Sequence, residues 1–226
     1  MRKVFLDCGS HNGCSVRTFK RLYADSSEFE IHCFEANPEH FPAYDDSEDW
    51  MSSVTLHKQA VWIEDGRKEF FISRSHTSST LERDKLNVQR PVRPPRKLLI
   101  PTKTYDTPVI NLGGWIKSTF TKDDHIVLKL DIEGSEYEVI ESMSLDGSLH
   151  YIDDVFGELH ASKMKRYRSS ETPEASARTA NNTLLETLED HGLVMWEWYA
   201  YERESPSGKF EGYRDLPLKY RKYNIL

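Results

Sequence analysis

Two carboxylates, Asp131 and Glu133, end an apolar run that also carries a lysine, Lys129. Residues 127–136 read VLKLDIEGSE, and the glycine breaks the strand pattern before a helix begins. A buried parallel strand is normally an almost continuous run of Val, Ile and Leu. Charged side chains there need partners or a wet cavity, because burying them alone costs too much free energy. Since open α/β sheets bind ligands at the carboxyl ends of their strands, this segment predicts a functional site.

Glu158 and His160 follow the next predicted strand, so we expect them beside Asp131 and name these three residues as the candidate catalytic set. His160 is the leading candidate for a general base, because the pKa of an ordinary histidine lies near neutrality. The alternative, a histidine hydrogen-bonded beneath a loop, stays open. Asp131 is expected to face the reaction centre, and Glu158 to orient the substrate or His160. Lys129 is expected to pair with one of the acids as a structural partner.

No metal ligand is predicted. Mg²⁺ is a hard cation that prefers carboxylates and water, and Asp131, Glu133 and Glu158 have suitable oxygens. Substrate hydroxyls or Lys129 would satisfy the same carboxylates without an ion, and this second interpretation is favoured. Loss of activity on chelation would reverse the preference.

A glycine-containing loop follows the first predicted strand and has the sequence LDCGSHNG. Glycines let the backbone turn sharply and approach a ligand closely. Neither the Gly-x-Gly-x-x-Gly pattern nor the Walker pattern is present. An acidic residue at the strand end repels a pyrophosphate but attracts an ammonium group, which favours S-adenosylmethionine as the cofactor. The loop residues expected to bind it are Asp7, Gly9, Ser10, Asn12 and Gly13.

The next two strands end in further candidate cofactor contacts. Glu35 lies where a ribose diol binds in related nucleotide sites, although a surface acid at a strand end is the alternative. Gln59 is expected to hydrogen-bond an adenine edge, and the small Ala60 to leave room for the ring. The same two residues also suit an ordinary polar turn.

Alternating strand and helix patterns predict a doubly wound, mostly parallel α/β sheet in one domain spanning 1–226. The expected strands are 3–7, 30–35, 54–58, 68–73, 125–132, 152–159, 193–202 and 217–226, and the expected helices are 15–24, 135–143 and 181–191. Polar segments at about 75–120 and 161–180 interrupt the pattern as lids, substrate loops or disordered insertions. Ser78 and Ser79 in the first segment either close over the pocket or are solvated.

Composition restricts the class of protein. The 226 residues are 38% hydrophobic, enough for one good core, and the net charge of −7 argues against a general nucleic-acid binder. Two basic clusters, 90–97 and 163–168, leave contact with an anionic substrate open. The three cysteines have no metal spacing and suggest free thiols in a reducing compartment. With no signal peptide and no stretch of membrane-spanning length, a cytoplasmic protein is expected, of undetermined oligomeric state.

These motifs together resemble the FkbM-like family of class I S-adenosylmethionine-dependent methyltransferases. The matching segments are LDCGSHNG (6–13), FEANPEHF (34–41), QAVW (59–62), TSSTL (77–81), IPTKTYD (100–106), LKLDIEGSE (128–136) and GELHA (157–161). The resemblance implies a seven-stranded, Rossmann-like methyltransferase sheet with a C-terminal antiparallel hairpin. It also implies O-methylation of a hydroxyl on a sugar or other small molecule.

Three other functions compete with this interpretation. A catalytically silent S-adenosylmethionine-binding scaffold should keep the cofactor residues and lose the strand-end acids, but both sets are present here. A methyltransferase acting on an anionic acceptor, such as RNA or a phosphorylated sugar, stays open because of the basic clusters. A nucleotide-dependent oxidoreductase ranks last, since its glycine fingerprint is missing.

Overall fold

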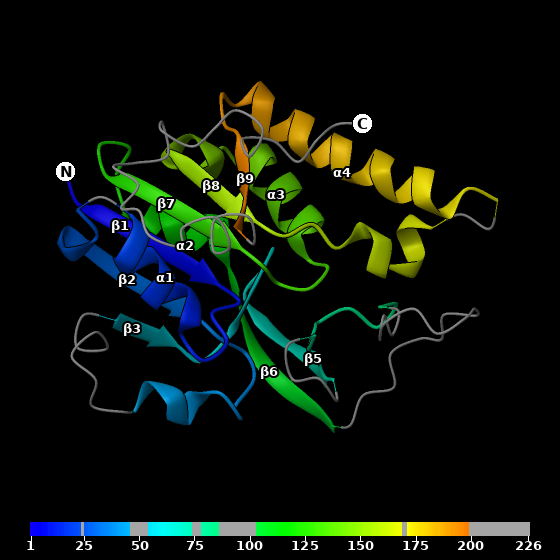
Figure 1. The fold of residues 1–226 in the computed structure, drawn as a ribbon, viewed down its shortest axis with the longest axis horizontal. Coiled ribbons are helices and arrows are strands. Elements are labelled where there is room, and N and C mark those ends of the chain that lie inside the picture. Colours follow the sequence, from blue (N-terminus) through cyan, green and yellow to red (C-terminus); the bar gives the residue numbers. More distant parts are fainter. Residues whose placement is uncertain (24, 46–53, 74–77, 86–102, 169–170, 199–226) are drawn as a thin grey trace.

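Six parallel strands form the central sheet of the computed structural model, which describes residues 1–23, 25–45, 54–73, 78–85, 103–168 and 171–198 (Figure 1). The strands are β1 (Lys3–Cys8), β2 (Phe29–Phe34), β3 (Val54–His57), β7 (His125–Leu130), β8 (Asp154–Gly157) and β9 (Met195–Glu197). Their order is β3-β2-β1-β7-β8-β9, and all neighbours pair in parallel. The order reverses between β1 and β7, which is where open α/β sheets bind ligands.

Successive apolar side chains of β1 point to opposite faces of the sheet, which explains why helices cover both faces. Val4 and Leu6 pack into a core with the three helices α2 (Leu112–Thr119), α3 (Glu136–Leu145) and α4 (Pro173–Asp190). Phe5 points to the opposite face and stacks on Phe19 of α1 (Cys14–Leu22), with ring centroids 3.9 Å apart. Both faces of the strand are therefore apolar, as a doubly wound sheet requires. Short 3₁₀ helices connect these elements: η1 (Ser26–Glu28), η2 (Phe41–Tyr44), η4 (Ser148–Tyr151), η5 (Ala161–Lys163) and η6 (Lys165–Tyr167).

A second, three-stranded sheet extends below the first in Figure 1. It contains β4 (Ala60–Trp62), β5 (Gly66–Ile72) and β6 (Lys103–Asn111) in the order β4-β6-β5, with β5 antiparallel to β6. The strand predicted at 68–73 corresponds to β5. The sheet encloses its own small core, which includes Trp62, Phe70 and Ile72.

The prediction of one polar insertion over 75–120 is wrong for its second half, which forms β6 and α2. The exposed residues of β6 lie in its first half and only Thr107 and Val109 are buried, so its apolar signal is weak, and Thr, Tyr, Val and Ile supply its strand preference. In α2, two glycines lower the helix propensity. The helix forms because Leu112 and Ile116 are buried and because the Oδ1 atom of Asn111 accepts a hydrogen bond from Gly114 N at 2.9 Å. Residues 86–102 lie outside the described part.

The second predicted insertion, 161–180, is also partly helical. It contains η5 and η6, and α4 begins at Pro173 rather than near residue 181. Proline is well suited to the first turn of a helix, where its missing N–H would have no partner. Ala177 then buries the added turn against the core.

The C-terminal end matches the sequence prediction only in part. Within the predicted strand 193–202, the described strand β9 is limited to three residues parallel to β8. The second strand of the expected hairpin, 217–226, lies outside the described residues. A mostly parallel α/β sheet is thus confirmed with six strands. Among the described residues, no helix is long and apolar enough to cross a membrane.

Candidate functional site

A cavity of about 530 Å³ lies at the carboxyl ends of β1, β2, β7 and β8, where the strand order reverses. Seven of the predicted site residues line it: Gly9, Ser10, Asn12, Glu35, Ala60, Asp131 and Glu158. Four others lie behind its wall in the part of the chain that the structure describes: Asp7, Gly13, Gln59 and His160. The sheet therefore brings residues from five separate segments to one site.

The loop after β1 turns sharply under the end of β2. Gly9 and Ser10 donate backbone hydrogen bonds to the carbonyl of Phe34, at 3.0 and 3.2 Å. Gly9 has a φ of +82°, and a Cβ on it would lie 1.9 Å from the carbonyl oxygen of Asp131. Only glycine allows this approach, so the loop is held against the end of β7. Gly13, with a φ of +77°, then caps the start of α1.

Asp7 is fully buried beneath this loop. Its carboxylate accepts hydrogen bonds from Lys129 Nζ at 3.0 Å and from the hydroxyl of Ser15. Lys129 also donates to Gly9 O at 3.3 Å and lies 3.8 Å from Asp131 Oδ2. Burial disfavours the charged lysine, but the two carboxylates outweigh burial and raise the pKa of Lys129. The expected structural pairing of Lys129 is found, and Asp7 supports the loop instead of lining the cavity.

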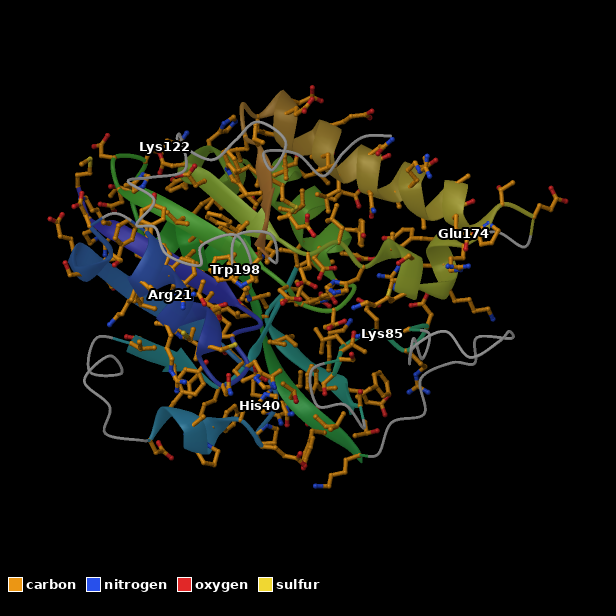
Figure 2. The ribbon with its side chains drawn as sticks, viewed as in Figure 1. Arg21, His40, Lys85, Lys122, Glu174 and Trp198 are labelled. Atoms are coloured by element: carbon orange, nitrogen blue, oxygen red, sulfur yellow. The ribbon has the colours of Figure 1, made fainter. Side chains whose placement is uncertain are left out.

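Glu35 lines the cavity and is 6% exposed. One carboxylate oxygen accepts a hydrogen bond from His11 N at 2.7 Å, and the other accepts from Asn37 N at 2.6 Å. Two backbone amides thus fix the carboxylate in place. The rings of His11 and His40 lie 3.8 Å apart, and both residues line the cavity. Figure 2 labels His40. Sequence reasoning did not single out these histidines.

The second sheet and the segment after β5 supply another part of the wall. Ala60, at the start of β4, lines the cavity as predicted, whereas Gln59 is half-buried outside it. Ser78 and Ser79 also line the cavity, so of the two interpretations for these serines the structure supports the one that places them at the pocket.

Asp131, Glu133 and Glu158 line one side of the cavity, which we call the acidic wall. His160 lies beneath this wall with its side chain 1% exposed. Its Nδ1 atom is 2.8 Å from Glu136 Oε1, and Nε2 lies 3.4 Å from Glu133, 3.6 Å from Glu158 and 3.8 Å from Asp131. Burial lowers the pKa of His160, but the surrounding carboxylates outweigh burial and raise it to about 10. The imidazole therefore carries its proton at neutral pH, and the prediction that it is a free general base is not supported by this geometry.

Two lysines hold the charged side chain of Glu133 in place. Lys85, 1% exposed, donates to Glu133 Oε2 at 2.5 Å and to the carbonyl of Ser78 at 2.8 Å. Lys163 lies 3.4 Å from the same carboxylate oxygen. Burial raises the pKa of Glu133, but His160 and the lysines overcome it and lower the pKa to about 2. Figure 2 shows Lys85 between β5 and the short helices after β8.

The basic cluster 163–168 is largely committed to internal contacts. Arg166 pairs with Glu82, Asp84 and Glu138 at 2.5–2.9 Å and donates to the carbonyl of Gly134 at 2.9 Å. These contacts tie η6 to the acidic wall. The other basic cluster, 90–97, lies outside the described residues.

Comparison with known proteins identifies the family. A family model described as the methyltransferase FkbM domain matches residues 7–192, most of the chain. The solved methyltransferase FkbM from Methylobacillus flagellatus KT is 15% identical, with a TM-score of 0.36, over 64% of this chain and 30% of that one. The chain thus aligns with less than a third of that protein's length. A comparison with curated proteins finds no significant match.

The family match contains the glycine loop, Glu35 and the acidic wall. It agrees with the resemblance that the sequence motifs indicate. The chain belongs to the FkbM methyltransferase family.

Proposed function

We propose that the protein is an S-adenosylmethionine-dependent O-methyltransferase that acts on a hydroxyl of a sugar or other small molecule. The observation that carries the proposal is the single cavity in which the glycine loop and Glu35 face the carboxylates of Asp131 and Glu158. One wall suits the cofactor and the other suits a hydroxylated acceptor. The volume of about 530 Å³ falls within the usual range for small-molecule sites.

The residues of the first wall fit the cofactor. Gly9 and Ser10 line the cavity, so the amino-acid tail would lie beside the backbone of this loop. The buried carboxylate of Glu35 would accept hydrogen bonds from the ribose diol, and Ala60 would leave space for the adenine. When bound, S-adenosylmethionine supplies an electrophilic methyl group on a sulfonium.

The second wall would hold the acceptor. Asp131 and Glu158 are 26% and 24% exposed, so their oxygens can accept a hydrogen bond from a hydroxyl in the cavity. Methyl transfer is an in-line displacement, and orienting the attacking oxygen at close range is the main task of the protein. Protonated His160, beneath these acids, would keep them ionised and positioned. We therefore assign proton acceptance to the carboxylates rather than to His160.

The alternative acceptors have less support. Lys163 lines the cavity and would favour an anionic acceptor, but Arg166 is neutralised by three acids. A silent scaffold has no use for a carboxylate wall open to the cavity. Cys8, Cys14 and Cys33, all in described segments, form no disulfide, in keeping with the cytoplasmic location that we propose.

Isothermal titration with S-adenosylmethionine, S-adenosylhomocysteine and NAD⁺ tests the cofactor. We expect binding of the two adenosyl compounds, at least about tenfold weaker in Glu35→Ala, because that change removes the ribose contact. Glu64→Ala removes an exposed acid away from the cavity and should bind like the parent protein. Binding of NAD⁺ alone, or of none of the three, would refute the proposal.

Methyl transfer from radiolabelled S-adenosylmethionine to a panel of hydroxylated sugars tests the acceptor class. Asp131→Asn should lower kcat while cofactor affinity stays within a factor of about three. Labelled product on nitrogen or carbon instead of oxygen would contradict the O-methyltransferase assignment.

A further inference from the structure

The acidic wall contains a buried imidazole nitrogen directed at several carboxylates. His160 Nε2 makes no hydrogen bond among the described residues. It lies 3.4 Å from Glu133 Oε2, 3.6 Å from Glu158 Oε2 and 3.8 Å from Asp131 Oδ1, all longer than a normal hydrogen bond. A buried polar atom without a partner is rare in folded proteins and requires an explanation.

These separations match those between atoms that share a metal ion. With bonds of about 2.1 Å and tetrahedral angles, ligand atoms lie about 3.4 Å from one another. One ligand atom from each of Asp131, Glu133 and His160 falls within 4.8 Å of the other two. A small movement of side chains would therefore bring all three onto one ion.

The surroundings of His160 also resemble those of a ligating histidine. Glu136 is fully buried, and its Oε1 lies 2.8 Å from the opposite ring nitrogen, Nδ1. A metal-bound histidine almost always donates its second N–H to such a carboxylate or carbonyl. Glu136 in turn accepts hydrogen bonds from the backbone N–H groups of Ile132 and Gly134, at 2.9 and 3.0 Å, so the ring orientation is fixed.

The positive charges of nearby lysines would partly oppose the binding of a cation at this site. Lys85 and Lys163 contact Glu133 Oε2, and Lys129 approaches Asp131. The cluster is therefore not a pocket of uncompensated negative charge, and its affinity for a cation should be moderate. The cation would take the place of the proton on His160 Nε2, which removes one positive charge as it adds two. The ion, rather than the imidazolium, would then keep the acids ionised and positioned.

We propose that Asp131, Glu133 and His160 bind one divalent transition-metal ion, with Glu158 as a neighbouring oxygen ligand. One imidazole with several carboxylates suits Mn²⁺ or Zn²⁺ better than Mg²⁺, which prefers oxygen alone. The sequence had favoured carboxylates satisfied without an ion, and the buried histidine changes that preference. Because Asp131, Glu133 and Glu158 line the cavity, the ion would present an open position to an acceptor oxygen, and this role rests on the proposed function.

The direct test is titration of the chelator-treated, full-length protein with Mn²⁺. We expect uptake of one equivalent, weakened at least about tenfold in Asp131→Asn and in His160→Gln. Glu141→Gln, an exposed acid on α3, is the matched control and should bind Mn²⁺ like the parent protein. Absence of uptake, or uptake unchanged in both cluster variants, would overturn the site.

Should either cluster variant fail to fold, electron spin-echo spectroscopy of Mn²⁺ on the parent protein decides the question. Coupling to an imidazole nitrogen is expected, and a spectrum with oxygen ligands alone would overturn the proposal. S-adenosylmethionine titration in the presence of chelator separates this site from the proposed function. Cofactor binding without Mn²⁺ uptake would refute the metal site alone. Mn²⁺ uptake without cofactor binding would support the metal site and refute the methyltransferase role.

Discussion

The two walls of the cavity are held in different ways. The glycine-loop wall is fixed mainly by backbone hydrogen bonds, such as those from Gly9 to Phe34 O and from His11 to Glu35. The acidic wall is fixed by buried side-chain charges, such as Lys85 with Glu133 and His160 with Glu136. The first wall should therefore be sensitive to changes in backbone conformation, and the second to changes in charge. Three predictions test this difference, from the largest expected effect to the smallest, and a fourth, smaller one concerns a histidine that belongs to neither wall.

Gly9→Ala should destabilise the protein most, by more than about 4 kcal/mol, because its Cβ would clash with backbone that cannot move aside. Gly147→Ala is the matched control, since Gly147 has a similar φ of +77° but nothing within 4 Å of an added Cβ. It should cost only about 1 kcal/mol of left-handed strain. Urea unfolding measures both, and equal losses would show that close approach at Gly9 contributes nothing.

Glu136→Ala should cost about 3 kcal/mol, because it leaves a buried imidazolium and two backbone N–H groups without their acceptor. Glu141→Ala, on the exposed face of the same helix, should stay within about 0.5 kcal/mol of the parent protein. The free energy of unfolding from urea denaturation separates them. A small loss at Glu136 would mean that buried charge does not hold the acidic wall.

Arg166→Ala should lower the free energy of unfolding by about 1 kcal/mol, because Arg166 belongs to a partly exposed network of three ion pairs and not to a single surface pair. The loss should shrink in 1 M salt, which screens such pairs. Thermal unfolding at two salt concentrations provides the measurement. A variant as stable as the parent, but with weaker acceptor binding, would instead place Arg166 among the substrate contacts.

The fourth prediction concerns His57, which does not line the cavity but packs on Phe34 with ring centroids 4.4 Å apart. Burial, with a smaller contribution from His32, lowers the pKa of His57 from its ordinary 6.5 to about 4. Between these values the unfolded chain binds more protons than the folded one, so stability should rise with pH from about 4 to 6.5. The contribution is fully present above 6.5 and is lost as pH falls towards 4.

Because His57 is half-exposed, this contribution should stay below about 1 kcal/mol. The stability difference between the parent protein and His57→Gln, measured from pH 4 to 7.5, should therefore grow with pH and level off above 6.5. A difference that is constant with pH would contradict the assignment.

Local patterns predicted the positions of β1, β2 and the turn at Gly9, because each is marked by residue types within a short stretch of sequence. The partner of Lys129 was harder to predict. The sequence offered the acids just beyond it, whereas parallel register places Lys129 opposite Asp7, 122 residues away. Strand register between distant segments cannot be read from one strand alone.

The sequence left the state of His160 open for a similar reason. An isolated histidine suggests a base near neutrality, but its pKa depends on carboxylates from the turn after β7, from α3 and from the segment after β8. Three elements were missed by sequence: β4 is only three residues long, β6 has few apolar residues, and α2 includes two helix-breaking glycines. Tertiary packing, rather than local preference, forms them.

The segment 78–85 links these observations to the order of folding. Its ends are fixed by residues that come later in the chain: Thr80 donates to Glu133 O at 2.8 Å, and Lys85 bridges to Met164 and pairs with Glu133. Contacts over such long sequence separations require closure of long loops and form slowly. We therefore expect the part of the cavity wall formed by residues 78–85 to assemble after β7 and β8 have paired. A nascent chain would then acquire its site only near the end of folding.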